Sequence, residues 1–186
     1  MYHLEDNMNI DISTKNLRLR PFTLEDAIDV LNLCNNLKLY ENTLNLPYPY
    51  TLEDAKEWIN YLKEYSDVNR MITLAIEDKS TLTLYGCIGA SISKIHKNAE
   101  IGYWLGERYW GKGIMTEVLT EFIKFLFENM NLNRIYGGHF LHNPASGKVM
   151  EKSGMKKEGI SRQVVLKNGK FYDIVNYAIL KEDFGR

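Results

Sequence analysis

The chain has 186 residues, the length of one compact domain with a sizeable core. Its 23 basic and 24 acidic residues leave a net charge of -1, so no overall field would draw it onto nucleic acid or anionic lipid. No apolar run approaches the roughly 20 residues that a membrane helix needs, and the first residues lack the features of a secretory signal. We therefore expect a cytoplasmic domain over residues 10–182 with tails at 1–9 and 183–186, and no membrane or direct nucleic-acid partner.

The first part of the chain predicts one strand and two helices. A strand pattern runs over residues 10–20 and ends at Pro21, which cannot continue it. Two segments of the form Thr-x-x-Asp, starting at Thr23 and Thr51, have the spacing of a helix cap and precede amphipathic patterns. We expect the first helix to reach about residue 35.

The segment 40–50 between these helices is rich in aromatic, amide and proline residues. Prolines stiffen it and tyrosines offer amphipathic contact surface, although a loop merely packed onto the core has the same composition. Because loops above a rigid scaffold often carry function, we expect this loop to contact a substrate. The candidate contacts are Tyr40, Glu41, Tyr48 and Tyr50.

The rest of the chain alternates strands and helices. Strands are predicted at 71–77, 84–93, 98–105 and 134–141, helices at 114–129 and 143–154, and a hairpin at 164–167 and 171–180. Asn168-Gly169 suits the positive φ angles of a type I′ turn in that hairpin. The order βααβββαβαββ is that of an α+β domain, with a mixed, mostly antiparallel sheet of six to seven strands flanked by helices.

The segment Arg108-Tyr-Trp-Gly-Lys-Gly113 lies between a predicted strand and a predicted helix. Glycines permit unusual φ angles and remove the Cβ atoms that would keep an anion from the backbone. Successive N-H groups can then converge at the positive end of the helix dipole. The segment therefore predicts a diphosphate site, to which Arg108 and Lys112 add cationic donors.

Spacing disfavours two other nucleotide-binding motifs here. A P-loop would need Ser or Thr after Lys112 to ligate magnesium, and the chain has Gly113. A dinucleotide fingerprint would need a third glycine where the chain has Thr116.

Arg-x-x-Gly-x-Gly in this setting resembles the pyrophosphate-binding motif of the GNAT superfamily of acetyl-CoA-dependent N-acetyltransferases. The resemblance extends over roughly residues 10–182. Its other segments are Leu17–Phe22, Pro49–Ala55, Ala99–Leu105, Asn143–Ser146 and Glu151–Met155. Their order resembles the branch of ribosomal-protein N-terminal (alanine or serine) acetyltransferases.

The resemblance implies acetyl-CoA as cosubstrate, without a metal. Backbone groups of Tyr103–Leu105 would pair with pantetheine as a neighbouring strand does, and one of their N-H groups would stabilise the oxyanion. N-H groups of Tyr109–Ile114 would bind the pyrophosphate. Lys148 and Lys152 would approach the adenosine phosphate, unless they are only solvated helix lysines. The candidate cofactor residues are Tyr103, Trp104, Leu105, Arg108, Tyr109, Trp110, Gly111, Lys112, Gly113, Ile114, Asn143 and Lys148.

Acetyl transfer to an amine passes through a tetrahedral oxyanion and requires a neutral nucleophile. Glu100 is the candidate base, acting directly or through water; its alternative is a solvated charge at a strand start. Ser146 is the candidate acid toward the thiolate; its alternative is a first-turn serine that binds helix N-H groups. Asn143 would cap the helix, bind the cofactor or acceptor, or do both.

Cys34 and Cys87 are too few and isolated for a disulfide framework, so we interpret both as reduced packing residues. His139 and His142 have an odd offset on a predicted strand and would point to opposite faces, which disfavours a metal site.

Three functions remain open. The first is acetylation of a protein N-terminal α-amine by direct attack in a ternary complex, and the resemblance is also compatible with a homodimer. The second is the same reaction on a small amine, such as an amino acid, polyamine, antibiotic or toxin, because acceptor choice depends on variable loops. The third is a noncatalytic sensor that binds acyl-CoA.

Overall fold

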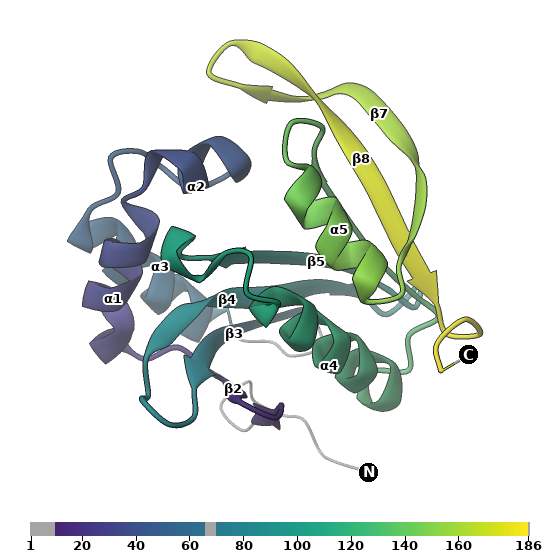
Figure 1. The fold of residues 1–186 in the computed structure, drawn as a ribbon, viewed down its shortest axis with the longest axis horizontal. Helices are drawn as coiled ribbons and strands as arrows, with labels where there is room; N and C mark the ends of the chain where they lie inside the picture. Colours follow the sequence, from purple (N-terminus) through teal and green to yellow (C-terminus); the bar gives the residue numbers. More distant parts are fainter. Residues whose placement is uncertain (1–9, 66–69, 186) are drawn as a thin grey trace.

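The computed structural model describes residues 10–65 and 70–185, whose arrangement is shown in Figure 1. The strands are β1 (Ile12–Ser13), β2 (Leu17–Arg20), β3 (Met71–Asp78), β4 (Leu84–Ser93), β5 (Asn98–Leu105), β6 (Arg134–Phe140), β7 (Lys156–Lys167) and β8 (Lys170–Leu180). The helices are α1 (Ala27–Cys34), α2 (Leu37–Asn42), α3 (Leu52–Glu64), α4 (Ile114–Asn129) and α5 (Pro144–Lys152). Short 3-10 turns, η2 (Leu24–Asp26) and η3 (Glu107–Tyr109), precede α1 and α4.

The α+β class is confirmed, but the predicted strand count and element order are wrong. Within the described residues the sheet has eight strands, not six to seven. The order is ββαααβββαβαββ, with one more strand and one more helix than predicted. The helices expected after Thr23 and Thr51 are confirmed, and each starts with a capping box to the Asp three residues later.

The additional strand arises because residues 10–20 form a hairpin instead of one continuous strand. Thr14 Oγ1 accepts a hydrogen bond of 2.9 Å from the Leu17 N-H, and the Thr14 N-H donates to the Leu17 carbonyl at 2.9 Å. These bonds close a tight turn, so β1 folds back antiparallel to β2.

The additional helix, α2, occupies the start of the segment that was predicted to be a loop. Asn36 caps it, because its side-chain oxygen accepts a hydrogen bond of 2.9 Å from the Leu39 N-H. At six residues α2 is too short to show an apolar period. Tyr40 and Glu41 therefore belong to the end of a helix.

The closing hairpin is longer than predicted. Its turn is confirmed, since Asn168 and Gly169 have φ angles of 51° and 74°. However, β7 begins at Lys156, eight residues before the predicted start. Two irregularities in its pairing with β8 interrupt the alternation of apolar and polar residues that would identify a strand. Gln163, with a φ of 51°, lies in the second irregularity.

The sheet order is β1-β2-β3-β4-β5-β6-β8-β7, and every neighbouring pair except β5 and β6 is antiparallel. Strands β5 and β6 pair only from Asn98 to Glu100, opposite Arg134 to Tyr136. Beyond Glu100, β5 continues to pair with β4 as far as Leu105. In the described ranges, 10–65 and 70–185, the edge of β5 that faces β6 therefore has no strand partner over its second half.

Helices cover both faces of this sheet. One face packs against α4, whose buried residues Val118, Leu119 and Phe122 are fully excluded from solvent. The other face packs against α1 and α3 through Val30 and Ala55. The β7–β8 hairpin extends past α5 toward α2 and lies above the gap between these elements (Figure 1).

Candidate active site

The turn before α4 has the geometry expected of an anion site. Gly111 and Gly113 have φ angles of 72° and 79°, which other residues adopt only with strain, and Gly113 is the N-cap of α4. A Cβ atom at either position would meet nothing within 4 Å, so there is open space beside both residues. Helix α4 leaves its first N-H groups without partners within the helix, and 16 residues of aligned dipoles point toward the turn.

A groove of about 350 Å³ lies between this turn, the second half of β5 and α5. Every candidate cofactor residue except Arg108 lines it. The Arg108 guanidinium instead stacks on the Tyr109 ring, 4.8 Å from its centroid. Lys152, expected beside Lys148, also lines the groove. The sequence did not indicate several other groove residues, which are Leu39, Asn42, Thr43, Met115, Thr116, Ala145 and Val149.

The partnerless edge of β5 forms one side of this groove. The Trp110 indole donates a hydrogen bond of 2.7 Å to the carbonyl of Leu105, which fixes the end of the strand against the glycine turn. An extended amide chain in the groove could therefore pair with the backbone of β5 before its anionic end reaches the N-terminus of α4.

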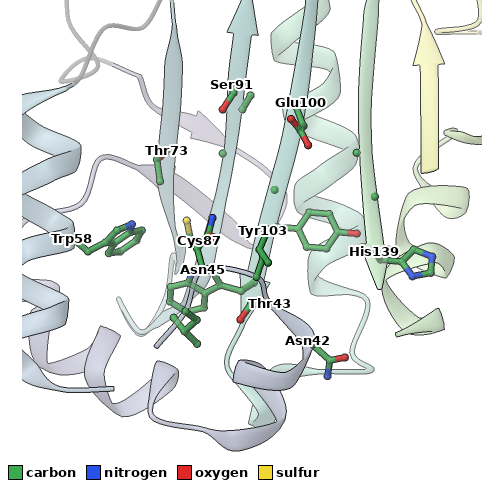
Figure 2. A pocket seen from close by; sticks show the side chains of 18 of the residues that line it. Asn42, Thr43, Asn45, Trp58, Thr73, Cys87, Ser91, Glu100, Tyr103 and His139 are labelled. Atoms are coloured by element: carbon green, nitrogen blue, oxygen red, sulfur yellow. The ribbon is translucent and has the colours of Figure 1, made fainter. Parts of the chain in front are cut away.

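A second cavity, of about 910 Å³, opens on the other side of β5 (Figure 2). Glu100 lines it and is exposed, and Trp58 lies at its far side. Among the described residues, the lining includes the carboxylates of Asp54, Glu57 and Glu100 but no lysine or arginine. This charge pattern favours a cationic ligand such as an ammonium group.

Glu100 and Tyr136 lie opposite each other in the last pair of residues that joins β5 to β6. Burial raises the pKa of Tyr136, and the Glu100 charge adds to this rise. The carboxylate therefore lies close to the point where the two strands separate.

The groove and the cavity share four lining residues, Asn42, Thr43, Tyr103 and Trp104. Glu100 lines only the cavity, and Ser146 lines only the groove. The Tyr103 hydroxyl oxygen lies 2.9 Å from Ser146 Oγ and 3.1 Å from the Ser146 carbonyl oxygen, within hydrogen-bond distance of both. The fold thus brings the two predicted catalytic side chains to opposite sides of one tyrosine.

Asn143 occupies the N-cap position of α5, and Pro144 is confirmed at the first helical position. The Asn143 side chain makes no capping hydrogen bond, and the residue lines the groove. Its amide is therefore available to a ligand, as one of the two predicted roles requires.

The segment 42–50 after α2 forms much of the cavity wall. Of the four candidate acceptor contacts, Tyr50 lines the cavity, whereas Tyr40, Glu41 and Tyr48 do not. Tyr40 is held by the β7–β8 hairpin: its hydroxyl accepts a hydrogen bond from the Asn168 amide, and its carbonyl accepts one from Lys167 Nζ.

Lys167 also donates to the Thr43 carbonyl at 2.6 Å and lies 3.8 Å from the centroid of the Tyr40 ring. Burial lowers the pKa of Lys167, and the charge of Glu41 opposes this effect. The hairpin is thereby fastened to the cavity wall.

His139 lines the cavity but was predicted only as a doubtful metal ligand. It is buried, and its Nδ1 lies 2.8 Å from the Phe140 carbonyl, while a Cβ at Gly147 would come within 2.5 Å of its Nε2. His142 lies beyond the end of β6, with Nε2 3.2 Å from the Glu41 carbonyl. Within residues 10–65 and 70–185, no three His, Cys, Asp or Glu side chains form a group that could hold a metal ion.

Both cysteines are free and buried, as predicted. Burial raises the pKa of the Cys34 thiol to about 12. In the part of the chain that the structure describes, no helix is long and apolar enough to cross a membrane.

A helix N-terminus for a diphosphate, an open strand edge for an amide chain and an adjoining acidic cavity for an amine together define an acyl-CoA-dependent transferase. The chain belongs to the acetyltransferase (GNAT) domain family, whose model matches residues 16–156. It is accordingly an N-acetyltransferase that uses acetyl-CoA, and the groove has both features that this cosubstrate requires.

The similar proteins include two from Bacillus subtilis that illustrate the range of matches. The uncharacterized N-acetyltransferase YoaA is 31% identical over 91% of this chain and 96% of its own length. The putative ribosomal N-acetyltransferase YdaF is 32% identical over 73% of this chain and 74% of its own. Among solved structures, Mycobacterium smegmatis RimJ in complex with CoA-disulfide superposes with a TM-score of 0.87 at 19% identity, over 98% of this chain and 92% of that one.

Proposed function

We propose that the protein acetylates the α-amine at the N-terminus of another protein, of the ribosomal-protein type, by direct attack within a ternary complex. The meeting of groove and cavity at Tyr103 carries this proposal, because it gives a thioester and an amine one point of contact. The similarity to the putative ribosomal acetyltransferase YdaF favours a protein acceptor.

The ionisation of the acceptor also favours an α-amine. With a pKa of about 7.7 to 8.0, an α-amine is roughly one tenth neutral at pH 7, whereas a lysine amine near 10.4 is neutral in less than about one part in a thousand. The carboxylates of the cavity would attract the ammonium form. A base is then needed to remove one proton.

Glu100 is that base in our proposal. It is the carboxylate of the cavity that lies on β5 itself, three residues from Tyr103, and it is exposed. It takes the ammonium proton directly or through one water, and the neutral amine then attacks the acetyl carbonyl carbon. As the C-S bond breaks, the sulfur keeps the electron pair, and the nitrogen of the new amide loses its remaining extra proton to solvent.

Ser146 lies on the leaving-group side. It lines the groove but not the cavity, so its hydroxyl is suited to donate a hydrogen bond to the sulfur. Asn143, with its uncommitted amide in the same groove, would hold the cosubstrate chain.

Labelled acetyl transfer tests the proposal. The enzyme is incubated with labelled acetyl-CoA and an extract treated to remove existing acetyl groups, and protein and small-molecule fractions are then separated. We expect label in a discrete protein, mapped by mass spectrometry to its N-terminal residue, and no label with Gly111→Glu.

Label confined to small molecules would contradict a protein acceptor and support acetylation of a small amine. Acetyl-CoA binding without transfer to either fraction would support the noncatalytic sensor.

A further inference from the structure

The hydroxyl pair formed by Tyr103 and Ser146 joins residues that are 43 positions apart, on β5 and in the first turn of α5. Tyr103 lines both the groove and the cavity, and Ser146 lines the groove (Figure 2 shows Tyr103 on β5). The pair therefore lies where the groove meets the cavity, which is where the proposed function places the thioester. Within the described residues, the polar contacts of the Tyr103 hydroxyl are the two atoms of Ser146.

We infer that Tyr103 is a positioning residue for departure of the thiolate: its O-H donates to Ser146 Oγ and thereby directs the Ser146 proton to the sulfur. This inference rests on the proposed role of Ser146 in the leaving-group step. It does not depend on which amine is the acceptor.

The number of donor protons in the pair explains why the hydrogen bond runs from Tyr103 to Ser146 Oγ. A hydroxyl has one donor proton. In one arrangement Ser146 donates its proton to Tyr103 Oη, and Tyr103 donates to the Ser146 carbonyl at 3.1 Å. That carbonyl lies in the first turn of α5 and already has a partner within the helix. When negative charge develops on the sulfur, the arrangement Tyr103 to Ser146 to sulfur becomes the favoured one, because both protons then point along the chain toward the anion.

The acidity of Tyr103 indicates that the pair stabilises the thiolate by hydrogen bonding and does not protonate it. Burial raises the pKa of Tyr103 to about 12, although the hydrogen bond with Ser146 lowers it. A thiol has a pKa of about 8.5, so proton transfer from tyrosine to sulfur would be uphill. The C-S bond breaks, the sulfur keeps the electron pair with the Ser146 O-H directed at it, and the thiolate takes its proton from solvent after release.

The test compares Tyr103→Phe, Ser146→Ala and their double variant by release of free thiol from acetyl-CoA. Any acceptor that the wild type uses will serve, and slow hydrolysis by water serves if none is found. We expect each single variant to lower kcat about tenfold, the effect of one hydrogen bond, while KM for acetyl-CoA changes less than about twofold. The double variant should be no slower than the slower single variant, because both act in one chain.

Tyr177→Phe is the matched control. The Tyr177 hydroxyl also bonds α5, through Glu151 Oε1 at 3.0 Å, but Tyr177 lines neither the groove nor the cavity. If Tyr103 only anchored α5, the two Phe variants would have similar effects on kcat. Our inference expects unchanged kcat for Tyr177→Phe.

Replacement of Tyr103 by 3-fluorotyrosine changes the acidity of the hydroxyl and keeps its hydrogen bonds, so kcat would not respond if Tyr103 only anchored α5. Fluorine makes the hydroxyl more acidic and a stronger donor, so kcat should equal or exceed that of the wild type. Equal losses in both Phe variants, additive losses in the double variant or a rise in KM alone would overturn the inference. If the proposed protein acceptor is wrong, the wild type would instead transfer acetyl only to small amines or water.

Discussion

The groove and the cavity are built in different ways. Most of the groove comes from two short stretches, 103–116 and 143–152, and the proposed anion site within it is backbone at one helix N-terminus. The cavity takes its lining from residues spread between Cys34 and Asn176, on three helices, a connecting segment and several strands. A site made by consecutive backbone groups can be identified from sequence, whereas a cavity assembled by long-range packing cannot.

The largest expected effect is on cofactor binding. Gly111→Glu places a carboxylate at the diphosphate site and forces a side chain onto a φ of 72°. We expect the Kd for acetyl-CoA to rise at least about a hundredfold, roughly 3 kcal/mol, as measured by calorimetry.

The control for backbone strain is Gly169→Glu in the type I′ turn, where φ is 74° and a Cβ also meets open space. It should bind acetyl-CoA as the wild type does. Equal weakening in both variants would mean that strain, and not the anion site, explains the first result.

The difference between the two sites also shows how far the sequence predicts this molecule. The bounds of β4, β5 and α4 agree with the predictions because these elements are long and regularly patterned. Helix α2 was missed because it has only six residues, and β7 was shortened because of its irregular pairing.

The site follows the same rule. The glycine turn and Asn143 were identifiable locally, and Glu100 and Ser146 were suggested by the resemblance. The bond between Tyr103 and Ser146, and the fastening of the cavity wall by Lys167, arise only when distant segments meet.

The next largest effect should be on chemistry within the cavity. Glu100→Gln removes the base without removing a hydrogen bond that the fold uses, so kcat at pH 7 should fall about a hundredfold. The deficit should shrink to less than about tenfold at pH 9.5, because an α-amine with a pKa near 8 is then neutral without assistance. Rates across pH 6 to 10 would measure this.

Glu57→Gln is the control, since Glu57 is another exposed carboxylate of the same cavity. It should change KM for the acceptor and leave the pH dependence of kcat as it is in the wild type. A Glu100→Gln enzyme whose deficit is the same at every pH would argue against Glu100 as base.

Two glycine substitutions distinguish the packing that holds α5 in place from the space that the cavity offers the acceptor. In Gly147→Ala the new Cβ would lie 2.5 Å from His139 Nε2 and 3.0 Å from the Tyr177 hydroxyl, so α5 must shift. We expect a loss of about 1 to 2 kcal/mol in the free energy of unfolding, since overpacking outweighs the better helix propensity of alanine.

In Gly102→Ala the Cβ meets nothing within 4 Å, but Gly102 lines the cavity, so the added methyl group takes up space there. Stability should be unchanged or slightly higher, while KM for the acceptor rises. Urea unfolding and initial rates on both variants check this pair, and an unaltered stability of Gly147→Ala would refute the packing account.

The smallest effect should come from the hairpin that fastens the cavity wall. Lys167→Met keeps the length of the side chain but loses its bonds to the carbonyls of Tyr40 and Thr43. We expect KM for the acceptor to rise about three- to tenfold, which corresponds to the free energy of one such hydrogen bond, with little change in KM for acetyl-CoA.

Lys170→Met is the control, because Lys170 is a lysine on the other strand of the hairpin and lies 5.2 Å from the Tyr172 ring centroid. An equal rise in KM for this variant would contradict the role of Lys167.

The central claim is that the groove and the cavity meet at Tyr103 so that acetyl passes directly from cosubstrate to amine. A crystal structure with a bisubstrate analogue, in which CoA is joined through an acetyl linker to the N-terminus of a short peptide, tests it most directly. We predict the CoA arm between the N-terminus of α4 and α5, the peptide arm in the cavity, and the linker beside Tyr103, with Ser146 on the sulfur side and Glu100 on the amine side. A peptide arm outside the cavity, or a linker remote from Tyr103, would contradict the account.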